Sequence, residues 1–190
     1  MFTKISRNTA ATALGITLLA PATLMAEGYG GPYGFGTTPS AEEIAMVDID
    51  VMPDGRGAPP GSGTHKDGKA VYASHCLACH GANLEGNSDL GAAALIGGRG
   101  SLTSGKPKKT IESYWPHAST VFDYVKRAMP FNAPGSLSDD DVYRVVAYIL
   151  GEANILDKSA TLNATSLAAV EMPNKDGFIP DPRPDIFNYD

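Results

Sequence analysis

Cysteine and tryptophan are both scarce in this sequence, which has two cysteines and one tryptophan among 190 residues. Basic residues are too few to balance the acidic ones, 15 against 21, and the formal net charge is −6. An acidic chain of this kind is not expected to bind nucleic acid, whose phosphates attract positive surfaces. Long apolar runs are also missing, apart from one near the N-terminus that is too short to span a bilayer. The composition therefore argues against a nucleic-acid-binding protein and against a membrane-spanning one, and it is compatible with a soluble protein.

The first 26 residues have the layout of an export signal. Lys4 and Arg7 precede a mostly apolar run from Ala10 to Ala20, and the segment ends in small residues at Ala26. Cleavage after Ala26 removes two of the 15 basic residues and none of the 21 acidic ones, so the mature chain has 13 basic residues and a net charge of −8. We expect residues 1–26 to be a signal peptide and the mature chain to be a soluble periplasmic protein. An uncleaved N-terminal anchor is the alternative.

Both cysteines lie in one short motif, Cys76-Leu77-Ala78-Cys79-His80. This spacing is typical of covalent haem attachment, in which each thiol bonds to a vinyl group and the histidine binds the iron. A thioredoxin-like dithiol is a second interpretation, but it expects the cysteines to follow a strand and has no use for the histidine. A structural zinc site is the third, and the other histidines (His65, His75 and His117) do not supply ligands at a regular short spacing. We predict one haem c and treat His65 and His117 as solvated.

Two long helices are predicted to frame this motif. The first begins at His65 and presents its apolar face inward, so that it delivers Cys76 to the interior. Gly68 costs this helix stability, which predicts that a second helix crosses it closely there, with Tyr143 or Tyr148 above the glycine. That second helix follows a cap at Ser138 and carries an apolar stripe from Val142 to Leu150.

Between them, a shorter helix is predicted from the capping pair Thr120 and Asp123 to Met129, where Pro130 ends it. Met129 is therefore placed at the start of a turn, from which its thioether can reach a metal. Thioether sulfur is a soft neutral donor that raises the potential of haem iron and leaves no position for a substrate. Met172 also precedes a proline and is the second choice, and a histidine or an open position is the remaining alternative.

The histidine of the motif needs a hydrogen-bond acceptor of its own. His80 is expected to donate its other ring N–H to a backbone carbonyl, and the loop Gly91–Gly97 is the expected source. Lys106–Lys109 contributes a local group of basic residues, for which a solvated loop is a better explanation than a docking patch. Residues 27–61 are rich in glycine and proline and form an N-terminal arm, whereas residues 156–190 contain four prolines near their end and form an extended C-terminal tail.

These residues resemble a known family. The helix with Gly68 and Tyr72, the motif ending at His80, the Met129-Pro130 turn and a terminal helix are similar to class I cytochromes c over residues 62–155. The resemblance implies an all-α fold around one covalent haem, with the first and last helices crossing. More narrowly, Trp115–Thr120, Arg127–Pro134 and the tail residues Met172–Asn174, Asp176–Phe178 and Asp181–Pro184 resemble the cytochrome subunit of periplasmic sulfane and sulfite dehydrogenases. In that family the cytochrome takes electrons from a subunit that carries a molybdenum cofactor.

The sequence thus predicts a periplasmic monohaem cytochrome c that transfers single electrons and is not itself an enzyme. Cys76 and Cys79 are the expected thioether anchors, and His80 and Met129 the expected axial ligands. The resemblance to sulfane and sulfite dehydrogenases implies a molybdenum enzyme as the electron donor. The rival interpretation is a haem enzyme, a peroxidase or a thiosulfate-oxidising protein, in which the sixth position is open or its ligand is displaceable. One such motif allows one haem, whereas the sulfane dehydrogenase subunit typically carries two.

Overall fold

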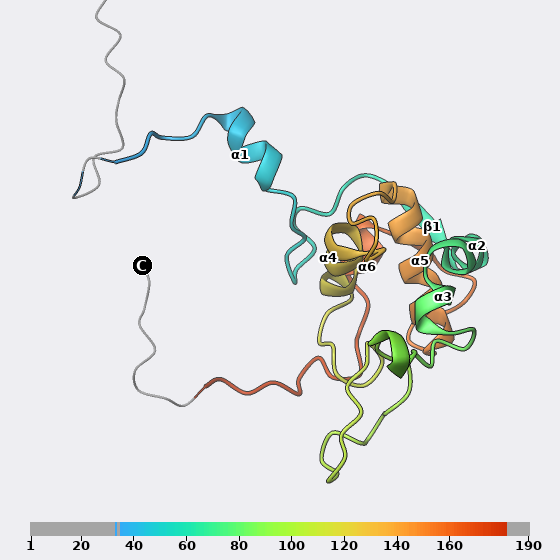
Figure 1. Ribbon diagram of the computed structural model, residues 1–190. Coiled ribbons are helices and arrows are strands. Elements are labelled where there is room, and N and C mark those ends of the chain that lie inside the picture. The colour runs from blue at the N-terminus through green and yellow to red at the C-terminus, as the bar shows by residue number, and fades with distance from the viewer. Residues whose placement is uncertain (1–32, 34, 182–190) are drawn as a thin grey trace, which may run out of the picture. The chain divides into compact units, whose positions relative to one another are not determined.

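The structure is a computed structural model, and it describes residue 33 and residues 35–181 (Figure 1). The predicted signal peptide, residues 1–26, lies outside the described residues. The chain divides into two units, Met1–Ile44 and Ala45–Asp190, and the second contains the motif of Cys76 to His80. Over the range that the structure describes, no helix combines the length and the apolar character needed to cross a bilayer.

Helices are the main elements of the described chain, together with one small sheet. Strands β1 and β2 pair antiparallel, with Gly63 opposite Leu162. The all-α prediction therefore holds for the helices but omits this sheet. The elements follow in the order α1 (Ala41–Val47), β1 (Ser62–Thr64), α2 (His65–His75), α3 (Leu77–His80), the 3-10 helix η1 (Ser88–Leu90), α4 (Ala118–Ala128), α5 (Asp139–Glu152), β2 (Thr161–Asn163) and α6 (Ala164–Ala168).

The structure differs from the expected extended tail in the residues before Pro173. Strand β2 and helix α6 both lie within residues 156–190. Asn163 accepts hydrogen bonds from the first turn of α6, and the Ser166 hydroxyl completes the capping box. Leu162, Leu167 and Met172 are all buried in the hydrophobic core. Since the tail's prolines begin only at Pro173, they do not prevent regular structure before it.

Helices α2 and α5 cross in close contact, as the glycine in α2 predicts. A Cβ atom at Gly68 would lie 1.8 Å from the Arg144 carbonyl oxygen and 2.8 Å from Tyr148 Cβ, so only glycine allows this approach. Tyr148 is thus the aromatic residue above Gly68, and its ring centroid lies 5.1 Å from that of Tyr72. Gly63 is packed equally tightly, since a Cβ there would lie 2.1 Å from the backbone nitrogen of Arg144.

The first residue of α2 corrects another expectation. His65 is not solvated: its Nε2 lies 2.7 Å from Glu152 Oε1, and its ring centroid lies 5.1 Å from that of Tyr148. Gly151 makes room for this ring, because a Cβ there would lie 2.5 Å from His65 Cδ2. His65 therefore joins the start of α2 to the end of α5.

Helix α4 begins at Ala118, two residues before the predicted start at Thr120. The predicted capping pair is absent because Asp123 bonds elsewhere. Its Oδ1 accepts a hydrogen bond from the Val51 backbone N–H at 2.9 Å, and both carboxylate oxygens accept from Arg127. The carboxylate of Asp123 thus fastens the N-terminal arm at Val51 to α4.

Helix α5 forms the centre of the core. Ser138 caps it as predicted, since the serine hydroxyl accepts a hydrogen bond from the Asp141 N–H at 3.2 Å. The helix contacts α2, α4 and both strands. Its apolar residues are buried together with those of α4, which are Ala118, Val121, Phe122 and Val125. In Figure 1, α5 lies between α2 and α4.

Candidate functional site

The motif lies where one helix ends and a shorter one begins. Cys76 is the residue between α2 and α3, and its N–H donates to the Tyr72 carbonyl at 2.9 Å. The backbone N–H groups of Cys79 and His80 donate in turn to the Cys76 carbonyl, at 3.1 and 2.9 Å. These bonds wind the five residues into about one helical turn, as the haem-attachment pattern requires. Both cysteines are free thiols, Cys76 half-buried and Cys79 exposed.

The environment of Cys76 does not suit a redox dithiol. Burial, and secondarily the neighbouring Cys79, raises the pKa of the Cys76 thiol to about 11. Reactive dithiols of the thioredoxin type depend on a thiol whose pKa is lowered, because the thiolate is the nucleophile. Nor does the motif follow a strand that opens a βαβ unit, because it lies at the end of α2. The structure therefore gives no support to the dithiol interpretation.

The imidazole of His80 is held by one well-defined hydrogen bond. Its Nδ1 lies 2.8 Å from the Ala93 carbonyl oxygen, which can only accept, so Nδ1 carries the proton and donates. In this tautomer Nε2 has a free lone pair, and it forms no hydrogen bond to any residue in the described part of the chain. A histidine that ligates a metal has this arrangement, with one ring nitrogen fixed by an acceptor and the other available. The acceptor lies in the predicted loop Gly91–Gly97.

The loop that presents the Ala93 carbonyl is itself tightly held. Asn87 and Ala92 exchange two backbone hydrogen bonds of 2.9 Å each, and the 3-10 helix η1 lies between them. Gly86 approaches this pair closely at φ +81°, where a Cβ would lie 2.5 Å from the Ala94 backbone nitrogen. The Gly86 N–H also donates to the His80 carbonyl at 2.8 Å. The loop is thus fastened to the residue whose ring it orients.

A tyrosine one turn before the motif fixes the other end of α3. The buried Tyr72 donates its hydroxyl to the Gly81 carbonyl at 2.7 Å, and burial raises the pKa of this phenol above its usual range. In the sequence, Tyr72 stands out only as a residue of the helix that precedes the motif. The one available signal for a role at the site was that an aromatic residue precedes Cys76 by four positions. The hydrogen bond to Gly81 could not be predicted, because Gly81 is nine residues further along the chain.

Met129 lies at the end of α4, as predicted, with an extended backbone at φ −122° and ψ 150°. Its side chain is half-buried and packs against the hydrophobic core. Met172, the alternative methionine, is 4% exposed and is a member of that core. A buried methionine that fills core space is the ordinary role of this residue, so the structure offers a packing explanation for Met172.

Several apolar side chains are only partly buried. They lie next to the motif in the sequence or in the loops that follow it. They pack against the core with one side and keep apolar surface exposed, which fits contact with an apolar macrocycle. Trp115 is one of them and meets Tyr124 edge-on, with ring centroids 5.6 Å apart. The others that flank the motif or follow it are Val71, Leu95, Ile96 and Leu137.

The described residues do not provide the ligand geometry that a structural zinc site needs. Among residues 33 and 35–181, no group of three or more His, Cys, Asp or Glu side chains is placed to hold a metal ion. A structural zinc site needs four such ligands together. The donors present are instead two free thiols and one oriented imidazole, the set that covalent haem attachment uses.

Comparison with known proteins agrees with this donor set. The model of the family described as cytochrome c oxidase, cbb3-type, subunit III, matches residues 63–149. One chain in the crystal structure of the sulfane dehydrogenase SoxCD from Paracoccus pantotrophus is 43% identical, with a TM-score of 0.73, over 79% of this chain and 73% of that chain. The chain belongs to the cytochrome c family. It resembles, within that family, the chains of sulfur-compound dehydrogenases, as the sequence motifs predict.

This cytochrome c is also similar to thiosulfate dehydrogenases. The protein of Allochromatium vinosum is 32% identical over 118 residues, which are 60% of this chain and 37% of that protein. The protein of Stutzerimonas stutzeri is 32% identical over 84 residues, 43% of this chain and 25% of that protein. The cytochrome thus matches only a minor part of these relatives' length. The similarity therefore concerns only part of either enzyme.

Proposed function

We propose that this protein is a periplasmic monohaem cytochrome c that carries single electrons from a sulfur-compound dehydrogenase to a later acceptor. Cys76 and Cys79 form the thioether bonds, and His80 and Met129 bind the iron. The hydrogen bond from His80 Nδ1 to the Ala93 carbonyl is the single observation that supports this most strongly. It leaves the lone pair of Nε2 free to bind the iron. Residues 1–26 act as the export signal in this proposal.

Covalent haem c supplies a one-electron iron couple, and the chain's own residues determine how that couple behaves. The Ala93 carbonyl orients the His80 ring and makes it a stronger electron donor. The thioether of Met129 completes the ligand set with a neutral atom, so that no position is left for a substrate. Cys76 and Met129 pack against the hydrophobic core, which would exclude water from that side of the haem and help to set its potential.

The electron donor is proposed to be a molybdenum-containing sulfite or sulfane dehydrogenase. The 43% identity to a chain of the sulfane dehydrogenase SoxCD supports this choice. The identity extends over 79% of this chain, which is more than the cytochrome domain of residues 63–149 alone. Residues outside the domain therefore share the resemblance, which is expected if they serve assembly with a similar dehydrogenase.

Replacing each of the two methionines in turn tests which of them is the sixth ligand of the iron. Leucine preserves the volume of methionine and removes the sulfur, so Met129→Leu and Met172→Leu form a matched pair. Met129→Leu is expected to lower the reduction potential of the haem and change its visible spectrum, because iron loses its soft sixth ligand. Met172→Leu is expected to leave both unchanged. A potential that responds to Met172→Leu alone contradicts the proposal and assigns the sixth position to the tail.

Thiosulfate oxidation by the cytochrome itself is the second candidate function. The similarity to thiosulfate dehydrogenases at 32% identity favours it. It requires an open or displaceable sixth position, where the sulfur anion reaches the iron. Purified holoprotein mixed with thiosulfate and an artificial electron acceptor distinguishes the two functions. Turnover without a partner enzyme establishes catalysis, whereas turnover only after addition of a dehydrogenase establishes electron transfer.

A further inference from the structure

Three lysines form a basic patch on this acidic chain. Lys106, Lys108 and Lys109 are all exposed, although the chain as a whole has a net charge of −6. None of their ammonium groups forms an ion pair with another residue of the described range 35–181. They lie in the loop between Gly97 and Ser113, which extends away from the helices as the yellow-green segment of Figure 1. The charge of the patch is therefore not neutralised by any residue that the structure describes.

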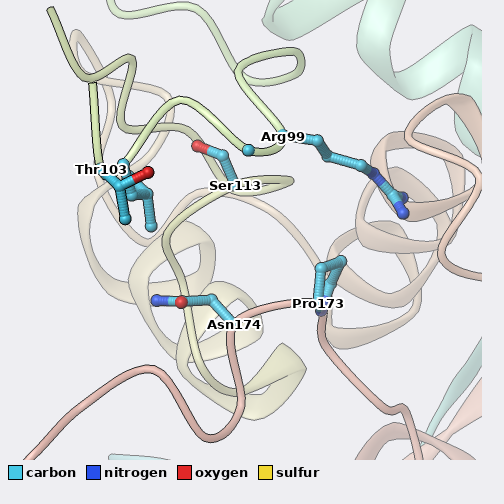
Figure 2. A pocket seen from close by; sticks show the side chains of 7 residues that line it. Arg99, Thr103, Ser113, Pro173 and Asn174 are labelled. Atoms are coloured by element: carbon cyan, nitrogen blue, oxygen red, sulfur yellow. The ribbon is translucent and has the colours of Figure 1, made fainter.

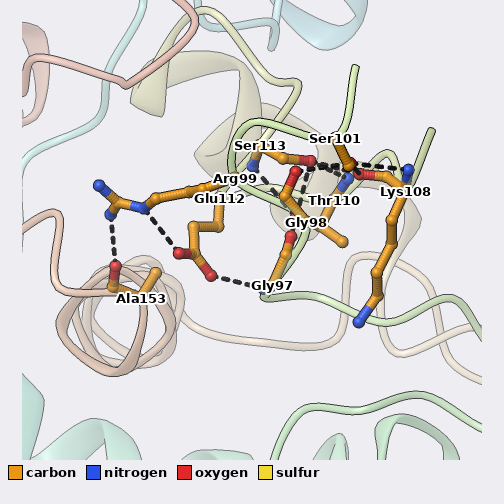
Figure 3. A network of polar contacts seen from close by, with 9 residues as sticks. All are labelled: Gly97, Gly98, Arg99, Ser101, Lys108, Thr110, Glu112, Ser113 and Ala153. Atoms are coloured by element: carbon orange, nitrogen blue, oxygen red, sulfur yellow. Dashed lines mark hydrogen bonds and ion pairs between the residues drawn. The ribbon is translucent and has the colours of Figure 1, made fainter. Parts of the chain in front are cut away.

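The base of this loop is rigid. Thr110 and Ser113 are buried, the Thr110 hydroxyl donates to the Gly97 carbonyl at 2.7 Å, and the Ser113 hydroxyl donates to the Lys108 carbonyl at 2.6 Å. The Lys108 N–H donates to Ser101 Oγ at 3.0 Å, so both backbone groups of this lysine are held (Figure 3). Figure 3 also shows the Lys108 side chain extending away from the network. The lysines are thus presented on a preorganised backbone, which reduces the entropy lost on binding.

The C-terminal tail returns to the same loop and adds apolar side chains. Asn174 Nδ2 donates to the Tyr114 carbonyl at 2.7 Å, and the Phe178 ring meets the Tyr114 ring edge-on at 5.2 Å. On the loop side, Lys109 Nζ lies 5.0 Å from the centroid of the Tyr114 ring. Phe178 is 51% exposed and Ile179 is 87% exposed. Tyr114 therefore links Lys109 to Phe178, and the exposed Ile179 follows Phe178 in the chain.

A hollow of about 270 Å³ separates the loop from the tail (Figure 2). The guanidinium of Arg99 at its border is already neutralised, because Nε donates to Glu112 Oε1 at 2.6 Å. The hollow is thus a recess for a side chain, and the positive charge comes from the lysines. Its lining comes from the loop, with Arg99, Leu102, Thr103 and Ser113, and from the tail, with Pro173 and Asn174.

We propose that this loop-and-tail surface, formed by Lys106, Lys108, Lys109, Phe178 and Ile179, docks the acidic face of the protein that donates electrons to the cytochrome. Exposed apolar groups beside a charged rim and a recess are the usual features of a protein interface. The opposite charge of the partner accelerates encounter, which suits a repeated transfer of single electrons. The proposal rests on the proposed function, in that the occupant is the electron donor.

An anionic membrane is a poorer match for this surface. Lysines near an anionic leaflet contribute about 1 kcal/mol each, and stable anchoring needs larger clusters. The patch has three lysines, and the remaining acidic surface is repelled by the same leaflet. A recess between loop and tail also has no use in lipid binding.

The experiment measures how fast the native periplasmic extract reduces the holoprotein when sulfite or thiosulfate is added, at low and at physiological ionic strength. The test variant is Lys106→Glu/Lys108→Glu, and the control is Lys66→Glu/Lys69→Glu, which makes the same charge change at two exposed lysines of α2. The test variant is expected to be reduced about tenfold more slowly at low salt, and the control within about twofold of wild type. Haem content and thermal unfolding of both variants are compared first.

A second variant, Phe178→Ser/Ile179→Ser, tests the apolar part without altering charge. It is expected to slow reduction at both salt concentrations, because apolar contacts are less sensitive to screening than charges. Equal slowing by the two lysine pairs overturns the proposal, as does a wild-type rate independent of salt. The proposal is also overturned in favour of a membrane by the following pair of results. The wild type cosediments with phosphatidylglycerol vesicles and Lys106→Glu/Lys108→Glu does not, while both are reduced at the same rate. If dithionite reduces the wild type but the extract does not, the donor assignment fails, and the docking proposal fails with it.

Discussion

Replacing Gly86 with alanine is expected to weaken the hydrogen bond that orients the His80 ring. The added Cβ would lie 2.5 Å from the Ala94 backbone nitrogen and 2.7 Å from the Ala93 carbonyl carbon, and real Cβ contacts are essentially never below 3.0 Å. Residues 93 and 94 must therefore move by about 0.5 Å. A shift of this size lengthens the 2.8 Å bond between Ala93 and His80 to about 3.3 Å, beyond the normal range.

The cost in stability has two parts. Alanine at the Gly86 φ of +81° loses about 1–2 kcal/mol through backbone strain. Overlap with the packed loop adds about 1–3 kcal/mol. Gly91→Ala is the matched control, because Gly91 has a similar φ of +67° but nothing within 4 Å of its added Cβ. In denaturant unfolding of the holoprotein, Gly91→Ala is expected to lower the free energy of unfolding by the backbone strain alone. Gly86→Ala is expected to lower it by the strain and the overlap together.

The reduction potential separates the two glycines further. A weaker bond to Ala93 makes His80 a poorer electron donor, which favours reduced iron and raises the potential. Potentiometric titration is expected to show this rise in Gly86→Ala and no change in Gly91→Ala. If both variants lose the same stability and keep the wild-type potential, Gly86 does not position the Ala93 carbonyl and the reasoning is refuted.

Two further predictions concern the fold. Gly68→Ala is expected to reduce the free energy of unfolding by more than about 3 kcal/mol, because its Cβ would overlap the Arg144 carbonyl at 1.8 Å, whereas Gly105→Ala has open space and should have little effect. Equal stabilities in denaturant would contradict the close crossing. Asp123→Asn is expected to lose about 1–3 kcal/mol at neutral pH. Burial raises the pKa of Asp123, but hydrogen bonds from Arg127 and the backbone outweigh it and hold this pKa below the usual value. The stabilisation is therefore present above the unfolded carboxyl's pKa of about 3.9 and is lost as pH falls through the lower folded pKa, so wild type and variant should converge in acid, and a constant difference would contradict this.

Local signals made the helices around the site predictable. Ser138 caps α5 through a neighbour three residues away, and the apolar stripe of that helix repeats with the helical period. Gly68 predicted the helix crossing because a glycine inside a helix needs a packing reason. The position of Met129 followed in the same way from the proline after it.

Features that join distant parts of the chain could not be read from the sequence. Strands β1 and β2 have three residues each, too few to show alternation, and lie almost a hundred residues apart. His65 and Glu152 are 87 residues apart, so nothing near His65 indicates its partner. At α4, the sequence assigned Asp123 to the wrong bond, because Val51 and Arg127 compete for the same carboxylate.

The sequence predicted the side chains that would hold the haem, but not the hydrogen bonds that position them. The spacing of Cys76, Cys79 and His80 indicates haem attachment, and the roles of the two thiols as anchors and of the imidazole as iron ligand stay predictions. The acceptor at Ala93 is a backbone carbonyl, which every residue possesses, so no side chain marks it. Tyr72 was visible as an aromatic residue, but its bond to Gly81 depends on how α3 turns after α2.

The register of β1 and β2 has a mechanical consequence. Ser62 lies opposite Asn163, and Thr64 opposite Thr161, so the segment before β1 and the segment after β2 leave from the same end of the ladder. Tension between these two segments opens the ladder one pair at a time, like a zip, and does not shear all pairs at once. The ladder itself therefore offers little resistance to such tension. The load falls on the bonds that tie the segment before β1 to α5, from the Ser62 N–H to Asp140 and from the Tyr143 hydroxyl to the Pro59 carbonyl.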